Sequence, residues 1–234
     1  MSFLMLSKGD PVARALLQRA IRARYGPRPL PVESFRLDMR TTARGPLGLP
    51  VRVKAQISFV GLTHWRRNET RSLFGLPVAK TVESFDGAAS YVMTGGRVSA
   101  SQDALVVGSF RRWLWALHAL LLTPLMDEDV VLKAAGERII QALPETDSED
   151  VATLTFNADD TLASVSVERY RLTDQRSLTF SLRPEDGLQT LSDFVIPARL
   201  VSVWEGELPQ EYAVTGVTLN PTIPLTEFTM QASP

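Results

Sequence analysis

Histidine is the residue that most often serves as a general base or metal ligand near neutral pH, and this sequence contains only His64 and His118. Neither histidine lies in an HExxH, HxH or similar motif, whose spacing would place two imidazoles on one metal ion. We therefore expect both to be structural. We predict that no metal binds in stoichiometric amount, and that replacing both histidines by Asn or Gln leaves function intact.

Carboxylates gather in two acidic stretches, residues 127–129 and residues 145–150. Neither stretch has the alternating oxygen ligands and distal Glu of a high-affinity calcium loop, so we expect solvated loops. The absence of cysteine excludes disulfides, thiolate nucleophiles and thiolate zinc sites. The GxSxG, GxxxxGK[ST] and GxGxxG motifs are absent as well. We therefore predict a non-enzymatic protein with no catalytic residues and no cofactor; an enzyme with scattered catalytic residues is a minor alternative.

The composition limits the partners that this chain can bind. Its 25 basic and 26 acidic residues are dispersed and give a net charge of −1, so no basic field attracts nucleic acid. The longest apolar run, residues 113–122, is well short of the roughly 20 residues that span a membrane as a helix. Residues 1–6 lack the cationic flank of a secretory signal. We expect a cytoplasmic protein, or an exported one whose signal was removed before this numbering begins.

The 234 residues are compatible with one domain, residues 1–234, whose elements follow from the apolar pattern. Asp10 is a suitable N-cap and Pro11 suits the first helical position, which predicts a helix over residues 10–25. From residue 33 to residue 101, and again from residue 151 to residue 220, apolar residues alternate with polar ones and predict strands. A turn is expected at residues 184–187. Residues 130–142 fit two strands or one short helix, and we favour strands.

Between the two strand-rich parts lies a predicted helix over residues 103–122, capped by Asp103 and ended by Pro124. Its apolar side chains surround nearly the whole helix, which therefore needs burial on several sides, a partner or lipid. Three interpretations are open. The helix is a core helix packed in the sheet, or it forms the wall of a lipid pocket, or it is an interfacial membrane helix with Arg111 and Arg112 at head-group level. We favour the first interpretation, and the first two are compatible.

The order of these elements predicts an α+β fold. We expect a curved antiparallel sheet over residues 33–220, an unclosed β-barrel of about ten or eleven strands. The N-terminal helix and the inserted apolar helix are expected to cover its concave face, and the helix over residues 103–122 is expected to cross that side.

Three short stretches carry a family resemblance. They are SFDGAASY at residues 84–91, the helix end LLLTP at residues 120–124, and the closing strands from residues 196–206 to residues 212–221. In this order they resemble the periplasmic lipoprotein carriers and outer-membrane lipoprotein receptors of bacteria, the lipoprotein-sorting superfamily. The resemblance implies an unclosed β-barrel whose helix-covered concave side holds acyl chains. It also implies the periplasm or cell envelope as the compartment, with an envelope protein as a partner.

The leading hypothesis is a binding or carrier protein that holds an apolar ligand, a lipid or lipoprotein acyl chain, inside this half-barrel. The alternative is a structural or protein-interaction domain with a filled core and no small ligand. Candidate ligand-binding residues come from the inner faces of the strands and from one face of the helix. They are Phe35, Leu37, Val53, Ala55, Ile57, Phe59, Tyr91, Trp113, Leu117 and Leu121.

Overall fold

A computed structural model describes residues 8–45, 48–145 and 149–231 of the protein. Within this part of the chain, fourteen strands form one sheet, which is accompanied by two α-helices. The apolar start at residues 1–6 and the middle of the second acidic stretch, residues 146–148, lie outside the described residues. The α-helices are α1 (Pro11–Tyr25) and α2 (Ala104–Leu121).

The strands follow the predicted alternation closely. They are β1 (Lys8–Gly9), β2 (Ser34–Arg44), β3 (Pro50–Val60), β4 (His64–Leu73), β5 (Leu76–Phe85), β6 (Ser90–Thr94), β7 (Arg97–Ser101), β8 (Val130–Gly136), β9 (Ile139–Pro144), β10 (Ala152–Phe156), β11 (Leu162–Arg171), β12 (Arg176–Leu191), β13 (Phe194–Trp204) and β14 (Gln210–Leu219). Short 3-10 turns follow α2 at Thr123–Met126 and β14 at Leu225–Glu227.

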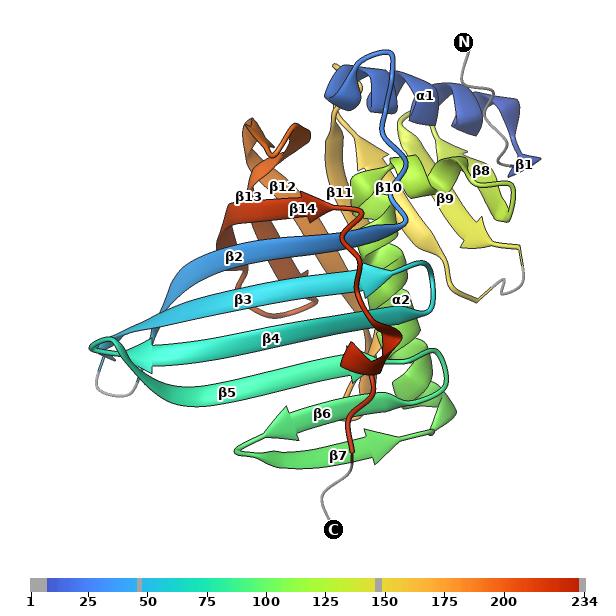
Figure 1. Ribbon diagram of the computed structural model, residues 1–234. Coiled ribbons are helices and arrows are strands. Elements are labelled where there is room, and N and C mark those ends of the chain that lie inside the picture. The colour runs from blue at the N-terminus through green and yellow to red at the C-terminus, as the bar shows by residue number, and fades with distance from the viewer. Residues whose placement is uncertain (1–7, 46–47, 146–148, 232–234) are drawn as a thin grey trace.

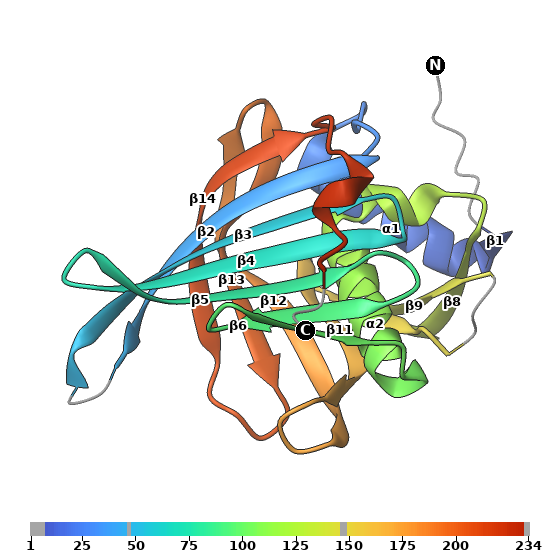
Figure 2. The same cartoon turned by 60° about the horizontal axis from the view of Figure 1, so that its bottom comes forward.

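The sheet is built from two antiparallel meanders that meet in its middle. Strands β2 to β7 pair in chain order, strands β8 to β14 pair in chain order, and β14 pairs with β2. Strands β1 and β7 are the two edges, so the sheet is not closed. Figure 1 shows α2 running between the two halves of the curved sheet, and Figure 2 shows β2 to β5 wrapping over one of its sides. The predicted curved sheet with a helix in its concavity is confirmed.

Helix α1 begins and ends as the sequence predicts. The Asp10 side chain accepts a hydrogen bond from the Val12 amide at 2.7 Å, and Gly26 ends the helix at a φ of 74° that favours glycine. The last turn of α1 contacts the end of α2, because Arg24 Nη1 donates to the Leu120 carbonyl at 2.6 Å. The Tyr25 hydroxyl donates to the Leu121 carbonyl at 2.8 Å. Helix α1 therefore fixes the C-terminal end of α2 against the sheet.

Helix α2 is the centre of the core. From Gly108 to Leu121 nearly every side chain is buried, including both tryptophans of the helix. Two indole N–H groups hold it in place: Trp65 Nε1 on β4 donates to the Phe110 carbonyl at 2.9 Å, and Trp115 Nε1 donates to the Ala142 carbonyl at 3.0 Å. The core-helix interpretation is therefore confirmed, and the interfacial-helix interpretation is wrong. In the described chain, no helix is both long and apolar enough to cross a bilayer.

Three details of the sheet differ from expectation. The sheet has fourteen strands and not ten or eleven, and one of them, β1, adds a parallel edge beside β8 that the sequence did not indicate. The two strands favoured for residues 130–142 are confirmed as β8 and β9. Residues 184–187 lie inside β12 and are not a turn: Asp186 and Gly187 form a bulge with φ of 58° and 73°, and pairing with β13 resumes at Leu188. The chain reverses instead at Ser192 and Asp193, whose φ values are 47° and 63°.

The acidic stretch at residues 145–150 also differs, because Asp150 is fully buried. Its carboxylate accepts hydrogen bonds from Arg111 Nε and, at 2.8 Å, from Arg112 Nε. A carboxylate loses its hydration on burial, so it is stable there only when charged donors replace the water. The two arginines that start the apolar part of α2 thus serve to dock the helix on the loop before β10.

Replacing Asp150 by Ala is expected to lower the free energy of unfolding by about 1 to 3 kcal/mol. Both arginines would lose their carboxylate, but they are 40% and 21% exposed and would regain part of their hydration from water. Glu128→Ala, at an exposed acidic residue, is the control and should change stability by less than about 0.5 kcal/mol. Equal urea midpoints for the two variants would contradict the role of Asp150.

Candidate ligand-binding site

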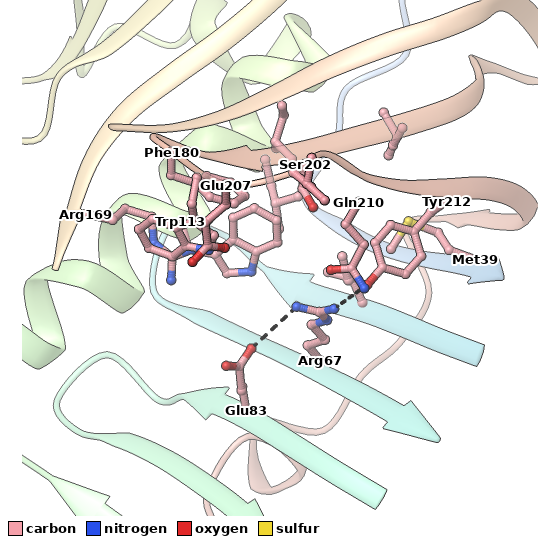
Figure 3. Close-up of a pocket in the computed structure, with 16 residues that line it drawn as sticks. Met39, Arg67, Glu83, Trp113, Arg169, Phe180, Ser202, Glu207, Gln210 and Tyr212 are labelled. Carbon is pink, nitrogen blue, oxygen red and sulfur yellow. Dashed lines mark hydrogen bonds and ion pairs between the residues drawn. The ribbon is translucent and has the colours of Figure 1, made fainter. Parts of the chain in front are cut away.

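A pocket of about 180 Å³ lies between α2 and the two halves of the sheet (Figure 3). Its apolar lining comes from α2, from β2 and β3, from the opposite strands β12 and β13, and from the loop between β13 and β14. The apolar lining residues are Met39, Ile57, Trp113, Leu117, Phe180, Leu182, Leu200, Trp204 and Leu208. An engineered apolar cavity of roughly 150 Å³ in another protein holds one benzene molecule. The pocket therefore has room for one short stretch of hydrocarbon.

One wall of the pocket is polar and belongs to β4 and β5. Arg67 Nη2 donates to the Glu69 carboxylate at 2.6 Å and to the Tyr212 hydroxyl at 2.9 Å, and Nη1 lies 3.9 Å from the Glu83 carboxylate. Burial by itself lowers the pKa of Arg67, but Glu83, Tyr212 and Glu69 more than offset this and raise the pKa. Arg67 is therefore a cation that the protein itself neutralises (Figure 3).

A second arginine, Arg169 on β11, lies on the other side of the pocket, beside Trp113 and Phe180 (Figure 3). Its guanidinium carbon is 5.2 Å from the ring centre of Trp113, 5.0 Å from that of Phe180 and 5.1 Å from that of Trp204. Such cation–π contacts contribute about 0.5 to 2 kcal/mol each. Burial lowers the pKa of Arg169 to about 10, so it remains charged at neutral pH.

Searches for related sequences gave no match: no family model matches this chain, and no curated protein matches it. Comparison with solved structures, in contrast, gave matches. A LolA superfamily protein from Nitrosomonas europaea superposes with a TM-score of 0.51 over 93% of this chain and 97% of its own, at 12% identity. The two proteins therefore share their overall fold.

Two further structures align at lower scores. A domain described as an outer membrane lipoprotein-sorting protein, from Vibrio parahaemolyticus, has a TM-score of 0.47 at 9% identity and covers 93% of this chain and 94% of its own. A DUF1329 family protein from Desulfovibrio piger has a TM-score of 0.48 at 9% identity and covers 94% of this chain and 98% of its own.

The fold distributes the ten candidate residues between pocket and core. Ile57, Trp113 and Leu117 line the pocket. Phe35 and Phe59 stack on each other at 5.5 Å in the packed core, and Tyr91 donates to the Asp86 carboxylate at 2.7 Å. The remaining candidates, which do not line the pocket, are Leu37, Val53, Ala55 and Leu121, all of them buried. Phe59 also packs 4.5 Å from the ring of His118 on α2, so the part of the concavity beside His118 is filled.

The polar half of the site was missed by the sequence interpretation, although the sequence contains a signal for it. In β4, Arg67 and Glu69 lie two and four residues after the buried Trp65. In β11, Arg169 lies at the same two-residue spacing after the buried Val165 and Val167. Because alternate residues of a strand share a face, these charges stand on the inner face of the sheet. A charged residue at such a position is rarely buried without a partner, and it is a better indicator of a site than an apolar one.

The two histidines lie apart from this pocket. His118 is buried between Phe59 and Trp115, at ring-centre distances of 4.5 and 6.5 Å, and its Nδ1 lies 2.9 Å from the Leu114 carbonyl. The Nδ1 of His64 lies 2.8 Å from the Thr63 hydroxyl. Across residues 8–45, 48–145 and 149–231, no three His, Asp or Glu side chains come together as metal ligands would.

Burial of His118 lowers its pKa to about 4, and this predicts a pH-dependent stability. The unfolded chain takes up a proton near pH 6.5 and the folded one only near pH 4, so stability falls as the pH drops through this window. Between pH 7 and pH 5, His118 alone should cost about 2 kcal/mol. The free energy of unfolding, measured with urea at pH 7 and at pH 5, tests this. His118→Leu should lose less stability than wild type over the same interval, and equal losses would contradict the assignment.

Proposed function

We propose that this protein is a non-enzymatic binding protein that holds a single apolar chain, from a lipid or a lipoprotein acyl group, in the pocket between α2 and the sheet. The observation that carries the proposal is the pocket itself. It lies on the concave side of a fold similar to that of a LolA superfamily protein, it is lined mainly by apolar and aromatic side chains, and a few polar groups lie on two of its sides.

The size of the pocket defines the ligand further. Each methylene moved from water to an apolar site contributes about 0.8 kcal/mol, so even a short chain gains useful affinity. A cavity of about 180 Å³ admits part of one chain, because most of the concavity is filled by α2. We therefore expect a single-chain ligand whose remaining length or head group extends to the rim beside Glu207 and Leu208.

The resemblance to lipoprotein carriers supports the cell envelope as the place of action, with an envelope protein as the partner that delivers or receives the chain. In that setting the pocket would shield the hydrocarbon during transfer through water. If the protein instead acts in the cytoplasm, we expect its ligand to be a soluble single-chain lipid.

Titration with decanol tests the proposal, because Trp113 and Trp204 line the pocket and report on its occupation through their fluorescence. We expect a saturable change in tryptophan emission and a negative heat-capacity change by calorimetry, which accompanies burial of apolar surface. A titration without saturation up to the solubility limit of decanol would favour the alternative, an interaction domain with no small ligand.

A further inference from the structure

The position of Arg169 is unusual for an arginine. It continues the inner face of β11 after Val165 and Val167, where the sheet otherwise presents apolar side chains to α2. Its Nε donates to the Ser109 carbonyl at 3.1 Å, which fixes the guanidinium at the pocket wall, and three aromatic rings surround it. The protein thus holds a cation beside an apolar pocket in one defined place.

The outer nitrogens of this guanidinium have no acceptor among the residues that the structure describes. Within the described residues, Arg169 forms no ion pair, and its one hydrogen bond uses Nε. The carboxylates around the pocket are engaged by other arginines: Glu83 lies 3.9 Å from Arg67, and Glu207 pairs with Arg171. A guanidinium has five N–H donors, so most of the donor capacity of Arg169 is unused.

Two other donors at the pocket also lack an acceptor, and these two are buried. The indole N–H of Trp113, a residue only 6% exposed, has no acceptor among the described residues, and neither has Nε of Arg67. Buried polar groups are almost always hydrogen-bonded, and an exception needs an explanation. Trp113 Nε1 and Arg67 Nε are such exceptions, and both are donors, so the partner that each lacks is an acceptor. The outer nitrogens of Arg169, which also lines the pocket, are donors as well.

We propose that the pocket takes amphiphiles with one chain and a compact anionic head, a carboxylate or a phosphate monoester, and that this head pairs with Arg169. The inference rests on the proposed function and adds the chemical class of the ligand. A guanidinium binds carboxylate or phosphate through two parallel N–H donors, and a charge-assisted hydrogen bond of this kind is stronger than a neutral one.

Four ligands with the same ten-carbon chain separate head-group recognition from chain binding: decanoate, decyl phosphate, decanol and decyltrimethylammonium. Calorimetry at one salt concentration should show the two anions binding at least about tenfold more tightly than decanol, with the ammonium ligand weakest. The ratio of decanoate to decyl phosphate then tells whether the natural head resembles a fatty-acid carboxylate or a lipid phosphate.

Two variants assign the preference to Arg169. Arg169→Met should bring the affinity for decanoate to that for decanol in the same variant, while Arg169→Lys should retain part of the preference. Arg176→Met, which removes an exposed arginine on β12, is the control for long-range charge and should retain it fully. Because Arg169→Met also removes a bond to α2, its folding is checked by thermal unfolding. The wild-type ligand series and the Lys variant test the inference even if the Met variant is unfolded.

The outcomes distinguish this inference from the proposed function. If decanol binds and decanoate binds no better, the anionic-head inference is overturned and the proposed function stands. Retention of the full preference in Arg169→Met, or its loss in Arg176→Met, would overturn the inference too. If none of the four ligands binds, the proposed function itself fails.

Discussion

Replacing Trp65 by Ala is expected to destabilise the protein by about 3 to 5 kcal/mol, the largest stability effect that we predict for one residue. Trp65 is completely buried, and its ring packs 5.3 Å from that of Phe110 and 6.1 Å from that of Trp113. Its N–H also donates to the Phe110 carbonyl. The substitution therefore leaves a cavity and removes the bond that ties the N-terminal half of α2 to β4.

Urea unfolding at neutral pH measures this effect. Phe74→Ala is the matched control, because Phe74 is also an aromatic residue of the β4–β5 region but is 80% exposed, and it should change stability by less than about 0.5 kcal/mol. A loss below about 1 kcal/mol for Trp65→Ala would mean that α2 is not packed against β4 as described.

Filling the pocket is expected to abolish ligand binding with little effect on folding. Ser202 is a small residue of β13 that lines the pocket, so Ser202→Trp places an indole in the space where we propose the chain binds. Decanol affinity should fall by at least about tenfold, since the displaced chain loses the burial of two or more methylenes. Overpacking a filled core usually costs about 1 to 3 kcal/mol. The loss in the free energy of unfolding should stay below this range, because the indole enters a pocket.

The neighbouring Val203 provides the control, because adjacent strand residues point to opposite faces of the sheet. Val203→Trp should leave decanol binding unchanged. Calorimetric titration of both variants decides the point. Unaltered binding in Ser202→Trp would place the chain elsewhere, and a large loss of stability would mean that this part of the concavity is packed.

Local signals in the sequence were sufficient to predict most of the architecture. Asp10 and Asp103 cap the two helices as expected, and each side chain accepts backbone hydrogen bonds from the first turn. The alternation in residues 51–59 places Val51, Ile57 and Phe59 on the buried face of β3, as the structure confirms. These features depend on residues close in sequence, which is why a pattern can reveal them.

The bulge in β12 shows where such signals are ambiguous. Asp186 and Gly187 adopt positive φ, which suits a tight turn, but the same dipeptide also suits a bulge within a continuous strand. The true reversal uses Ser192 and Asp193, neither of which is a glycine. Only the pairing of β12 with β13 on both sides of the bulge decides between the two structures.

The candidate site was harder to predict, because it depends on which inner-face residues α2 covers. Phe35 and Phe59 have the same apolar pattern as Ile57, but they pack in the filled part of the concavity. The position and tilt of α2 are fixed by contacts distant in sequence, such as those of Arg24 with Leu120 and Asp150 with Arg112. No local pattern encodes these contacts.

The most direct test of the proposed function is a crystal structure of the protein with decanol brominated at its chain terminus, because anomalous scattering locates the bromine without ambiguity. We predict one bromine site inside the pocket, in contact with Trp113, Leu117 or Phe180, with the hydroxyl directed toward the rim. Bromine bound only at the outer surface, with the pocket empty, would contradict the account.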